Sequence, residues 1–275
     1  MAPDALIDLV LREGAQAIYP ILLFTLLRPL GLVFGFVAFT WAVGRARVLR
    51  MSIATGLGLP TLAVHADQLA AVVAIEATAS LALLAGKEFL IGYAMGFLAS
   101  LPFFALQFAG AITDAFRGET DSGLIDPMGG TLQTSALLYV LIGLSVFAAA
   151  GGLWGLVTIL YGSYDVWTLT APLPRLDAGA LGIAMDAFGA MLLLTVRTAL
   201  PLLALLLAIE FVAAVAARLA KKFGLQDLTF TAKNLVTILM LPVIAWFVLR
   251  VAEPATAQVE TALAVLALLF GLTPP

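Results

Sequence analysis

Cysteine is absent from this sequence of 275 residues, and histidine occurs only once, at His65. Without thiols the chain has no disulfides, thiolate metal ligands or cysteine nucleophiles. His65 falls between apolar segments, where we expect an ordinary loop residue, and Ser163 has no candidate base beside it in the sequence. No glycine-rich phosphate loop follows a strand pattern. We therefore predict a protein that is not an enzyme and that holds no metal or cofactor.

Charge is also scarce in this sequence. Charged residues make up 11% of the chain and hydrophobic residues 63%, whereas soluble domains carry roughly a quarter charged residues. A surface so poor in charge suits lipid better than water, so we predict an integral membrane protein. The net charge of −3 is too small to indicate a nucleic-acid partner. No polar stretch is long enough for a separate soluble domain, so residues 1–275 are expected to form a single membrane domain.

The apolar residues form runs of uneven length. A membrane-spanning helix needs about 20 of them, within a range of roughly 17–25. One run is too long for a single span, and Pro201 in its middle is expected to kink or divide it. We predict an all-α fold with about 6–8 apolar helical segments, some kinked or non-spanning. The runs lie near residues 17–43, 51–64, 69–86, 88–112, 134–160, 180–216, 231–250 and 255–272.

Several charged residues lie within these apolar runs or at their ends. A charge at the bilayer centre costs about 2.5–3.5 kcal/mol on insertion scales, so these side chains must pair, line water or contact a partner subunit. A proton or ion relay is one interpretation, and internal salt bridges or snorkelling from segment ends is the other. Snorkelling suits Glu88 best and Arg28 least. The residues are Arg28, Glu76, Glu88, Asp186, Arg197 and Glu210.

Three pairs of glycines are spaced four residues apart within apolar runs. This spacing flattens one face of a helix, so that a second backbone can approach closely and pack against it. We therefore predict helix-packing faces at these positions. The pairs are Gly31 with Gly35, Gly92 with Gly96, and Gly151 with Gly155.

A polar stretch interrupts the apolar sequence between residues 112 and 134. It carries Asp114, Arg117, Glu119, Asp121 and Asp126 between two segments that should not tolerate charge. Asp114 and Arg117 are three residues apart, so they can pair if the turn is helical. Something other than lipid must receive this loop, which favours a conduit or an assembly over a simple anchor.

The residues of this stretch resemble a known family, the T component of type III secretion export gates (the SctT family), whose flagellar counterpart is the FliR family. The resemblance extends over nearly the whole chain, and the version here is more similar to the injectisome branch. The residues that carry it are Arg28, Leu101-Pro-Phe-Phe104, Ala109-Gly-Ala-Ile-Thr-Asp114, Arg117-Gly118, Ile125-Asp126-Pro127, Gly151-Gly152-Leu153, Ser163-Tyr164, Pro201, Glu210, Arg218 and Lys233.

The resemblance implies a multi-pass protein of the bacterial inner membrane, built from packed helical hairpins. It implies assembly with R-type and S-type export-gate subunits, with the U-type switch protein alongside, around a conduit for unfolded secreted proteins. The stretch from Gly110 to Gly130 would then contribute a plug that closes the channel. The plug residues implied are Gly110, Asp114, Arg117, Gly118, Asp126 and Pro127.

Our leading hypothesis is therefore a structural, channel-forming subunit of an export gate. Lys233 joins the charged residues above as a candidate for buried or intersubunit contacts. The alternative is a stand-alone ion-coupled transporter that uses the intramembrane carboxylates as a relay. Such transporters have paired broken helices in two symmetrical halves, and this sequence has no such symmetry.

Overall fold

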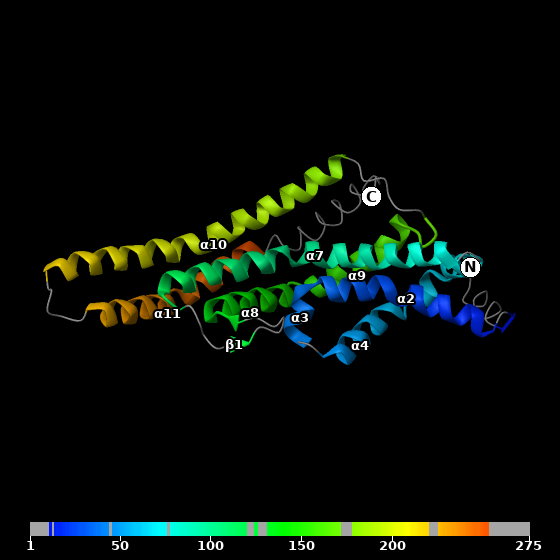
Figure 1. Cartoon of the computed structure of the whole chain (residues 1–275), viewed down its shortest axis with the longest axis horizontal. Helices are drawn as coiled ribbons and strands as arrows, with labels where there is room; N and C mark the ends of the chain where they lie inside the picture. Colours follow the sequence, from blue (N-terminus) through cyan, green and yellow to red (C-terminus); the bar gives the residue numbers. More distant parts are fainter. Residues whose placement is uncertain are drawn as a thin grey trace. The chain divides into compact units, whose positions relative to one another are not determined.

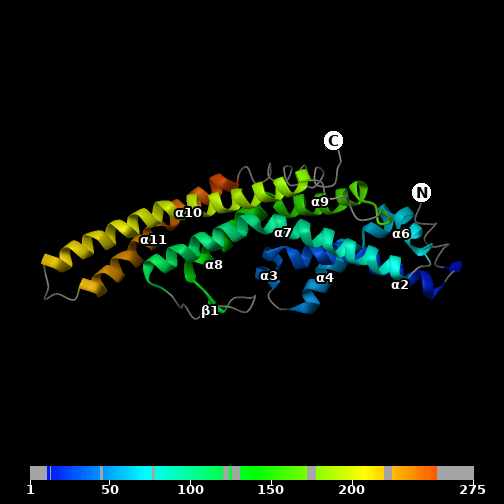
Figure 2. The ribbon, with the colours of Figure 1, turned by 45° about the horizontal axis from the view of Figure 1, so that its top comes forward.

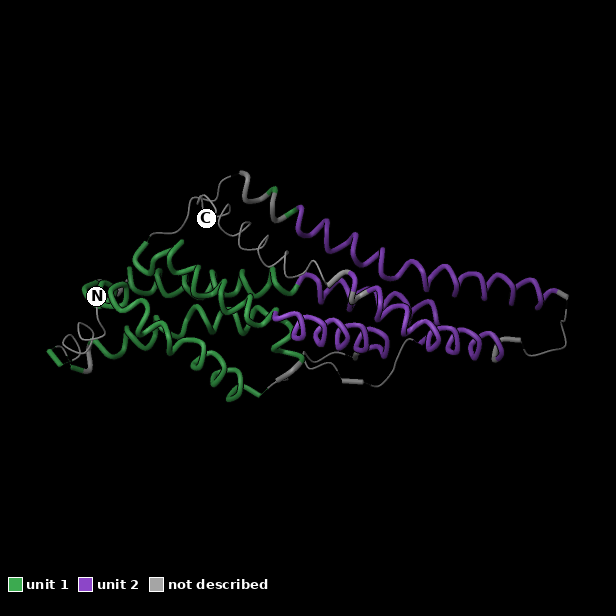
Figure 3. The backbone as a smooth tube through the Cα atoms, turned by 180° about the vertical axis from the view of Figure 1, so that it is seen from behind, with its two compact units in different colours: residues 1–100, 152–185, 258–275 green, residues 101–151, 186–257 purple. Residues whose placement is uncertain are grey.

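The computed structural model describes residues 11–12, 14–43, 46–75, 78–119, 124–125, 131–171, 178–219 and 225–252. The chain forms two compact units, coloured separately in Figure 3. Unit 1 contains residues 1–100, 152–185 and 258–275, and unit 2 contains residues 101–151 and 186–257. The expectation of a single membrane domain stays a prediction.

The secondary-structure elements described in unit 1 are all helices. Its helices are α2 (Ala15–Gly35), α3 (Val37–Val43), α4 (Arg47–Gly58), α5 (Thr61–Val64), α6 (Ala66–Val73), the first part of α7 (Thr78–Arg117) and α9 (Gly152–Val166). Helices α4 and α6 both pack against α2 (Figures 1 and 2). The core of the unit is apolar, with Phe24 and Leu32 of α2, Leu69 of α6 and Leu160 of α9 fully buried.

Unit 2 contains the rest of α7, then α8 (Thr134–Ala149), most of α10 (Ala178–Leu219) and α11 (Leu225–Ala252). Two short antiparallel strands, β1 (Leu124–Ile125) and β2 (Thr131–Leu132), lie between α7 and α8. Helix α11 packs against α8 and runs beside α10 (Figures 1 and 2). Leu106, Tyr139, Leu202 and Leu206 are buried in the core of this unit.

The predicted all-α membrane fold is confirmed. By length and composition, four described helices could cross a membrane: residues 17–35, 80–117, 185–218 and 228–247. Two bent pairs raise this number to six if each pair counts as one span. The pairs are residues 47–64 with 66–73, which are bent by 91°, and α8 with α9.

Several helix boundaries differ from the apolar runs. The charged pair Lys87 and Glu88 separates the runs 69–86 and 88–112 in the sequence. No helix ends there, because α7 continues through both residues to Arg117. The run 134–160 is instead divided into α8 and α9 at Gly151, whose φ of 78° lies in the left-handed region that favours glycine. The run 255–272 lies outside the described residues.

Pro201 does not divide its run, which corrects one of the two expected outcomes. Helix α10 passes through this proline as one element of 42 residues. Apolar helices with neighbours can absorb the missing backbone hydrogen bond through local adjustments. The expected kink at Pro201 stays a prediction.

Candidate functional site

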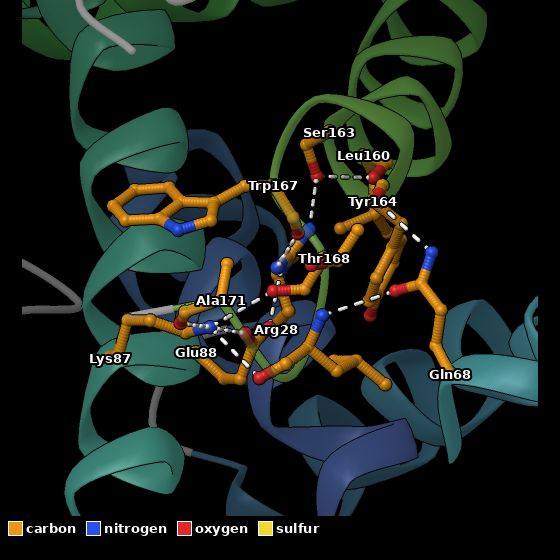
Figure 4. Close-up of polar contacts among 11 residues, drawn as sticks. Arg28, Gln68, Lys87, Glu88, Leu160, Ser163, Tyr164, Trp167, Thr168 and Ala171 are labelled. Carbon is orange, nitrogen blue, oxygen red and sulfur yellow. Dashed lines mark hydrogen bonds and ion pairs between the residues drawn. The ribbon is translucent and has the colours of Figure 1, made fainter. Parts of the chain in front are cut away.

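Arg28 lies at the centre of a buried polar cluster in unit 1 (Figure 4). Its Nε donates to Oε2 of Glu88 at 2.7 Å. Its Nη1 donates to Oγ of Ser163 at 3.0 Å, and its Nη2 donates to the carbonyl of Trp167 at 2.9 Å. The guanidinium carbon lies 4.0 Å from the centre of the Tyr164 ring, within the range of a cation–π contact. Every arginine nitrogen therefore has an acceptor, and the side chain is fully buried.

Lys87 adds a second cation to the same cluster. Its Nζ lies 3.0 Å from Oε1 of Glu88. The same ammonium donates to three backbone carbonyls, those of Thr168 at 3.1 Å, Leu169 at 2.9 Å and Ala171 at 2.9 Å (Figure 4). Each oxygen of Glu88 therefore faces a different cation. Through these contacts, α7 holds the segment that follows α9.

These contacts correct the expectation that Glu88 snorkels from a segment end. Glu88 is fully buried and lies well inside α7, because that helix begins at Thr78. Arg28 is fully buried as well. Of the two interpretations of these charges, the contacts at Arg28 and Glu88 are those of an internal salt bridge.

Sequence reasoning missed four polar members of this cluster. Lys87 was not singled out as a site, Ser163 was considered as a hydroxyl without a base and as part of the family resemblance, and Gln68 was not considered. Gln68 donates to the carbonyl of Tyr164 at 3.3 Å and accepts from the backbone N–H of Leu169 at 3.1 Å. His65, expected to be an ordinary loop residue, is buried with its ring 4.8 Å from that of Tyr164. The adjacent charges Lys87 and Glu88 within an apolar run were the one usable signal.

The first two predicted glycine pairs lie where α2 and α7 meet. A Cβ atom added at Gly31 or Gly35 would collide with the α7 backbone at Phe89 or Tyr93. A Cβ added at Gly92 or Gly96 would collide with the α2 backbone at residues 28 and 32. The two pairs therefore face one another, and this close approach brings Arg28 within reach of Glu88.

The third pair is a correction. Gly151 lies in the turn between α8 and α9 rather than on a helix face, and a Cβ there would meet nothing within 4 Å. Its positive φ is the physical reason for glycine at this position. Gly155 lies in α9 and is half-buried.

The predicted plug stretch begins as helix, which corrects its expected boundary at Gly110. Helix α7 continues through Gly110, Asp114 and Arg117 and ends at Gly118, whose φ is 90°. The backbone N–H of Glu119 donates to the carbonyl of Asp114 at 3.0 Å, as in a glycine-ended helix. Gly110 serves close packing, since a Cβ there would collide with the backbone of Ala136 in α8.

Asp114 connects the end of α7 to the start of α8. Its carboxylate accepts from the backbone N–H of Ser135 at 2.7 Å and from the Ser135 hydroxyl at 2.5 Å. Arg117 pairs with Asp114 at 3.0 Å, as their spacing predicts for a helix, and also with Glu119. The Thr134 hydroxyl donates to Glu119 at 2.8 Å. The two ends of the polar stretch are thus held together.

The remaining predicted charges are distributed differently. Lys233 of α11 pairs with Glu210 of α10 at 3.0 Å and donates to the carbonyl of Phe116 at 3.0 Å. Asp186 and Arg197 are exposed on α10. Three predicted residues lie outside the described part of the chain: Glu76, Asp126 and Pro127.

The arrangement of unit 2 leaves apolar surface uncovered. We compared the most apolar 18-residue stretch of each long helix. Only 17% of that stretch is buried in α10 and in α11, against 50% in α2 and in α7. An apolar groove of about 480 Å³ lies between α10 and α11. Its lining residues are Leu205, Ala208, Ile209, Val212, Ala213, Leu228, Thr229, Ala232 and Val236. These surfaces suit lipid or apolar protein rather than water.

A family model described as bacterial export proteins, family 1, matches residues 19–259. The chain belongs to this family. The match extends over most of the chain and confirms the resemblance inferred from the sequence. With its apolar helices, the chain is a membrane protein of the bacterial export family.

Two curated relatives align with part of the chain. The Yop proteins translocation protein T of Yersinia pestis is 32% identical over 164 residues, which cover 59% of this chain and 62% of the relative. The surface presentation of antigens protein SpaR of Shigella flexneri is 29% identical over 158 residues, which cover 56% and 59%. The chain therefore spans less than two thirds of the length of either relative.

Proposed function

We propose that this export-family protein is a structural subunit of a bacterial type III secretion export apparatus. In this proposal it lies in the inner membrane and helps to build and close the conduit through which unfolded proteins leave the cell. It carries out no bond chemistry. Its partners are the R-type and S-type gate subunits, with the U-type switch protein alongside.

The observation that carries this proposal is the family match over residues 19–259. The names of the relatives, a translocation protein and a surface presentation protein, agree with it. The uncovered faces of α10 and α11 add physical support, because a subunit of a larger assembly needs apolar surface for its neighbours. The length of α10 is also consistent with this proposal. Its 42 residues amount to about 63 Å at 1.5 Å per residue, which is roughly twice the hydrocarbon thickness of a bilayer and more than a single membrane span needs.

Co-expression tests the proposal directly. The chain, carrying an affinity tag, is co-expressed with the R-type and S-type proteins of the same genome, extracted in mild detergent and purified by the tag. We expect one complex that contains both partners and survives size-exclusion chromatography. A monodisperse chain that leaves both partners in the flow-through would contradict the proposal.

The stand-alone ion-coupled transporter remains the second candidate. A relay needs carboxylates that can exchange protons or ions, yet Glu88, Asp114 and Glu210 each pair with a cation in the structure. Reconstitution separates the two candidates. Ion-coupled solute uptake by liposomes that contain only this chain would favour the transporter, whereas the export-gate proposal expects none.

A further inference from the structure

We infer that Glu88 and the backbone carbonyls of Thr168, Leu169 and Ala171 form a binding site for a small monovalent cation. In this chain the tethered ammonium of Lys87 occupies that site (Figure 4). The inference goes beyond the proposed function, because it concerns which ligand holds the segment after α9 against α7.

The ligand set is that of a cation site. Four oxygens lie 2.9–3.1 Å from one nitrogen, three of them backbone carbonyls and the fourth a carboxylate oxygen of Glu88. Backbone carbonyl oxygens also replace the hydration shell of a monovalent cation in potassium-channel selectivity filters. The segment that supplies them follows the C-terminal end of α9, where the helix dipole also favours positive charge.

Glu88 is the carboxylate that faces this position, through the oxygen that does not pair with Arg28. Arg28 and Lys87 supply two positive charges and Glu88 supplies one negative charge. Without the Lys87 ammonium, Arg28 and Glu88 still pair, but the three carbonyls lose their shared donor. Of the three residues, Leu169 is fully buried, and a buried carbonyl without a donor is costly. A small cation that returns to the position of Nζ would restore these contacts.

The test is chemical rescue of a Lys87→Ala variant of the full chain, purified in detergent. Alanine keeps Cβ, and n-propylammonium supplies the missing three carbons and the ammonium. We expect the substitution to lower Tm by roughly 5–10 °C. We expect n-propylammonium chloride to restore at least half of that loss, with saturation at millimolar concentration.

Two matched controls identify the site. Tetramethylammonium carries the same charge but has no N–H to donate, so it should restore little of the loss. Lys87→Met removes the charge while filling the space of the lysine stem. This variant should be destabilised like Lys87→Ala, yet n-propylammonium should not rescue it because the cavity is occupied.

Three results would overturn the inference. The first is a Lys87→Ala variant with the Tm of the unsubstituted chain, and the second is equal rescue by n-propylammonium and tetramethylammonium. If Lys87→Ala cannot be purified from ordinary buffer, extraction is repeated in n-propylammonium chloride, and recovery only there supports the site. The third result is that Lys87→Ala cannot be purified from either buffer while Lys87→Met retains the Tm of the unsubstituted chain. Because only the purified chain is measured, none of these results bears on assembly with partner subunits.

Discussion

Arg28 shows how an arginine becomes tolerable inside an apolar helix. Its three donor nitrogens each have an acceptor, from Glu88, Ser163 and Trp167, and its face lies against Tyr164. A guanidinium suits this role because its planar fork presents donors in fixed directions and also stacks on aromatic rings. Three helices or their ends, α2, α7 and α9, are joined at one side chain.

Removing Glu88 alone should therefore be severe. A Glu88→Met variant leaves two buried cations with no carboxylate, and we expect a loss of about 3–5 kcal/mol in unfolding free energy. The double variant Arg28→Met with Glu88→Met removes one charge of each sign, so it should cost less than the sum of the two single changes. Thermal or denaturant unfolding of the purified variants measures the coupling. Additive single and double effects would contradict the paired arrangement.

The sequence predicted that Arg28 and Glu88 need partners, and the reason was the cost of charge in lipid. It could not identify those partners, because Glu88 is 60 residues from Arg28 and Ser163 is 135 residues away. Backbone acceptors carry no side-chain signature, so the carbonyls that bind Lys87 were invisible as well. The i, i+3 pair of Asp114 and Arg117 was predictable because helix geometry alone brings it together.

At the scale of elements, the contact between α2 and α7 depends on the absence of side chains. Spacing alone predicted packing faces at Gly31, Gly35, Gly92 and Gly96, and these residues lie at the α2–α7 contact. The same spacing misled at Gly151, since glycine there serves a left-handed turn. The spacing shows only where glycines occur in the sequence. The backbone conformation determines whether a glycine packs against a second helix or forms a left-handed turn.

Two single substitutions in α7, at Gly92 and at Gly86, provide a matched test of this contact. Gly92→Ala places a methyl group against the carbonyl of Arg28, and we expect a loss of about 1–3 kcal/mol from the forced separation of the helices. Gly86→Ala changes the same helix at a position with nothing within 4 Å. It should be neutral or stabilising by about 0.5–1 kcal/mol through helix propensity. Equal unfolding midpoints for the two variants would exclude a packing role for Gly92.

Helix ends were the weakest part of the sequence prediction. The charged pair at residues 87 and 88 suggested a break, but the buried contacts of Lys87 and Glu88 let α7 continue. At the far end, Asp114 and Arg117 suggested a loop, yet their charges are met by each other and by Ser135. In both places tertiary contacts pair the charged side chains. The helix therefore continues where the hydrophobic pattern alone predicts that it ends.

At the scale of the whole molecule, the role of the polar stretch after Gly118 as a plug stays a prediction. Its ends are close, because the Thr134 hydroxyl donates to Glu119 at 2.8 Å. A short linker of about four residues can therefore replace residues 120–132 without pulling α7 and α8 apart. In cells that express this variant with the R-type and S-type subunits, we expect the membrane to leak ions or small solutes.

Cells that express the same variant without the partner subunits are the control, and they should stay tight. Co-purification with both partners must be checked in parallel, so that leakage is compared between assembled gates. An assembled complex with the shortened stretch and a membrane as tight as that of the original chain would refute the plug role.

The contacts of Arg28 also form in a fixed order during synthesis of the protein. Ribosomes add roughly 5–20 residues per second, so Glu88 is synthesised about 3–12 s after Arg28, and Ser163 about 7–27 s after it. During the first interval α2 exists with an arginine whose carboxylate has not been made. During synthesis, α2 therefore precedes the partner of its arginine in α7, and the acceptors of Arg28 are complete only after α9 and Trp167 have been made.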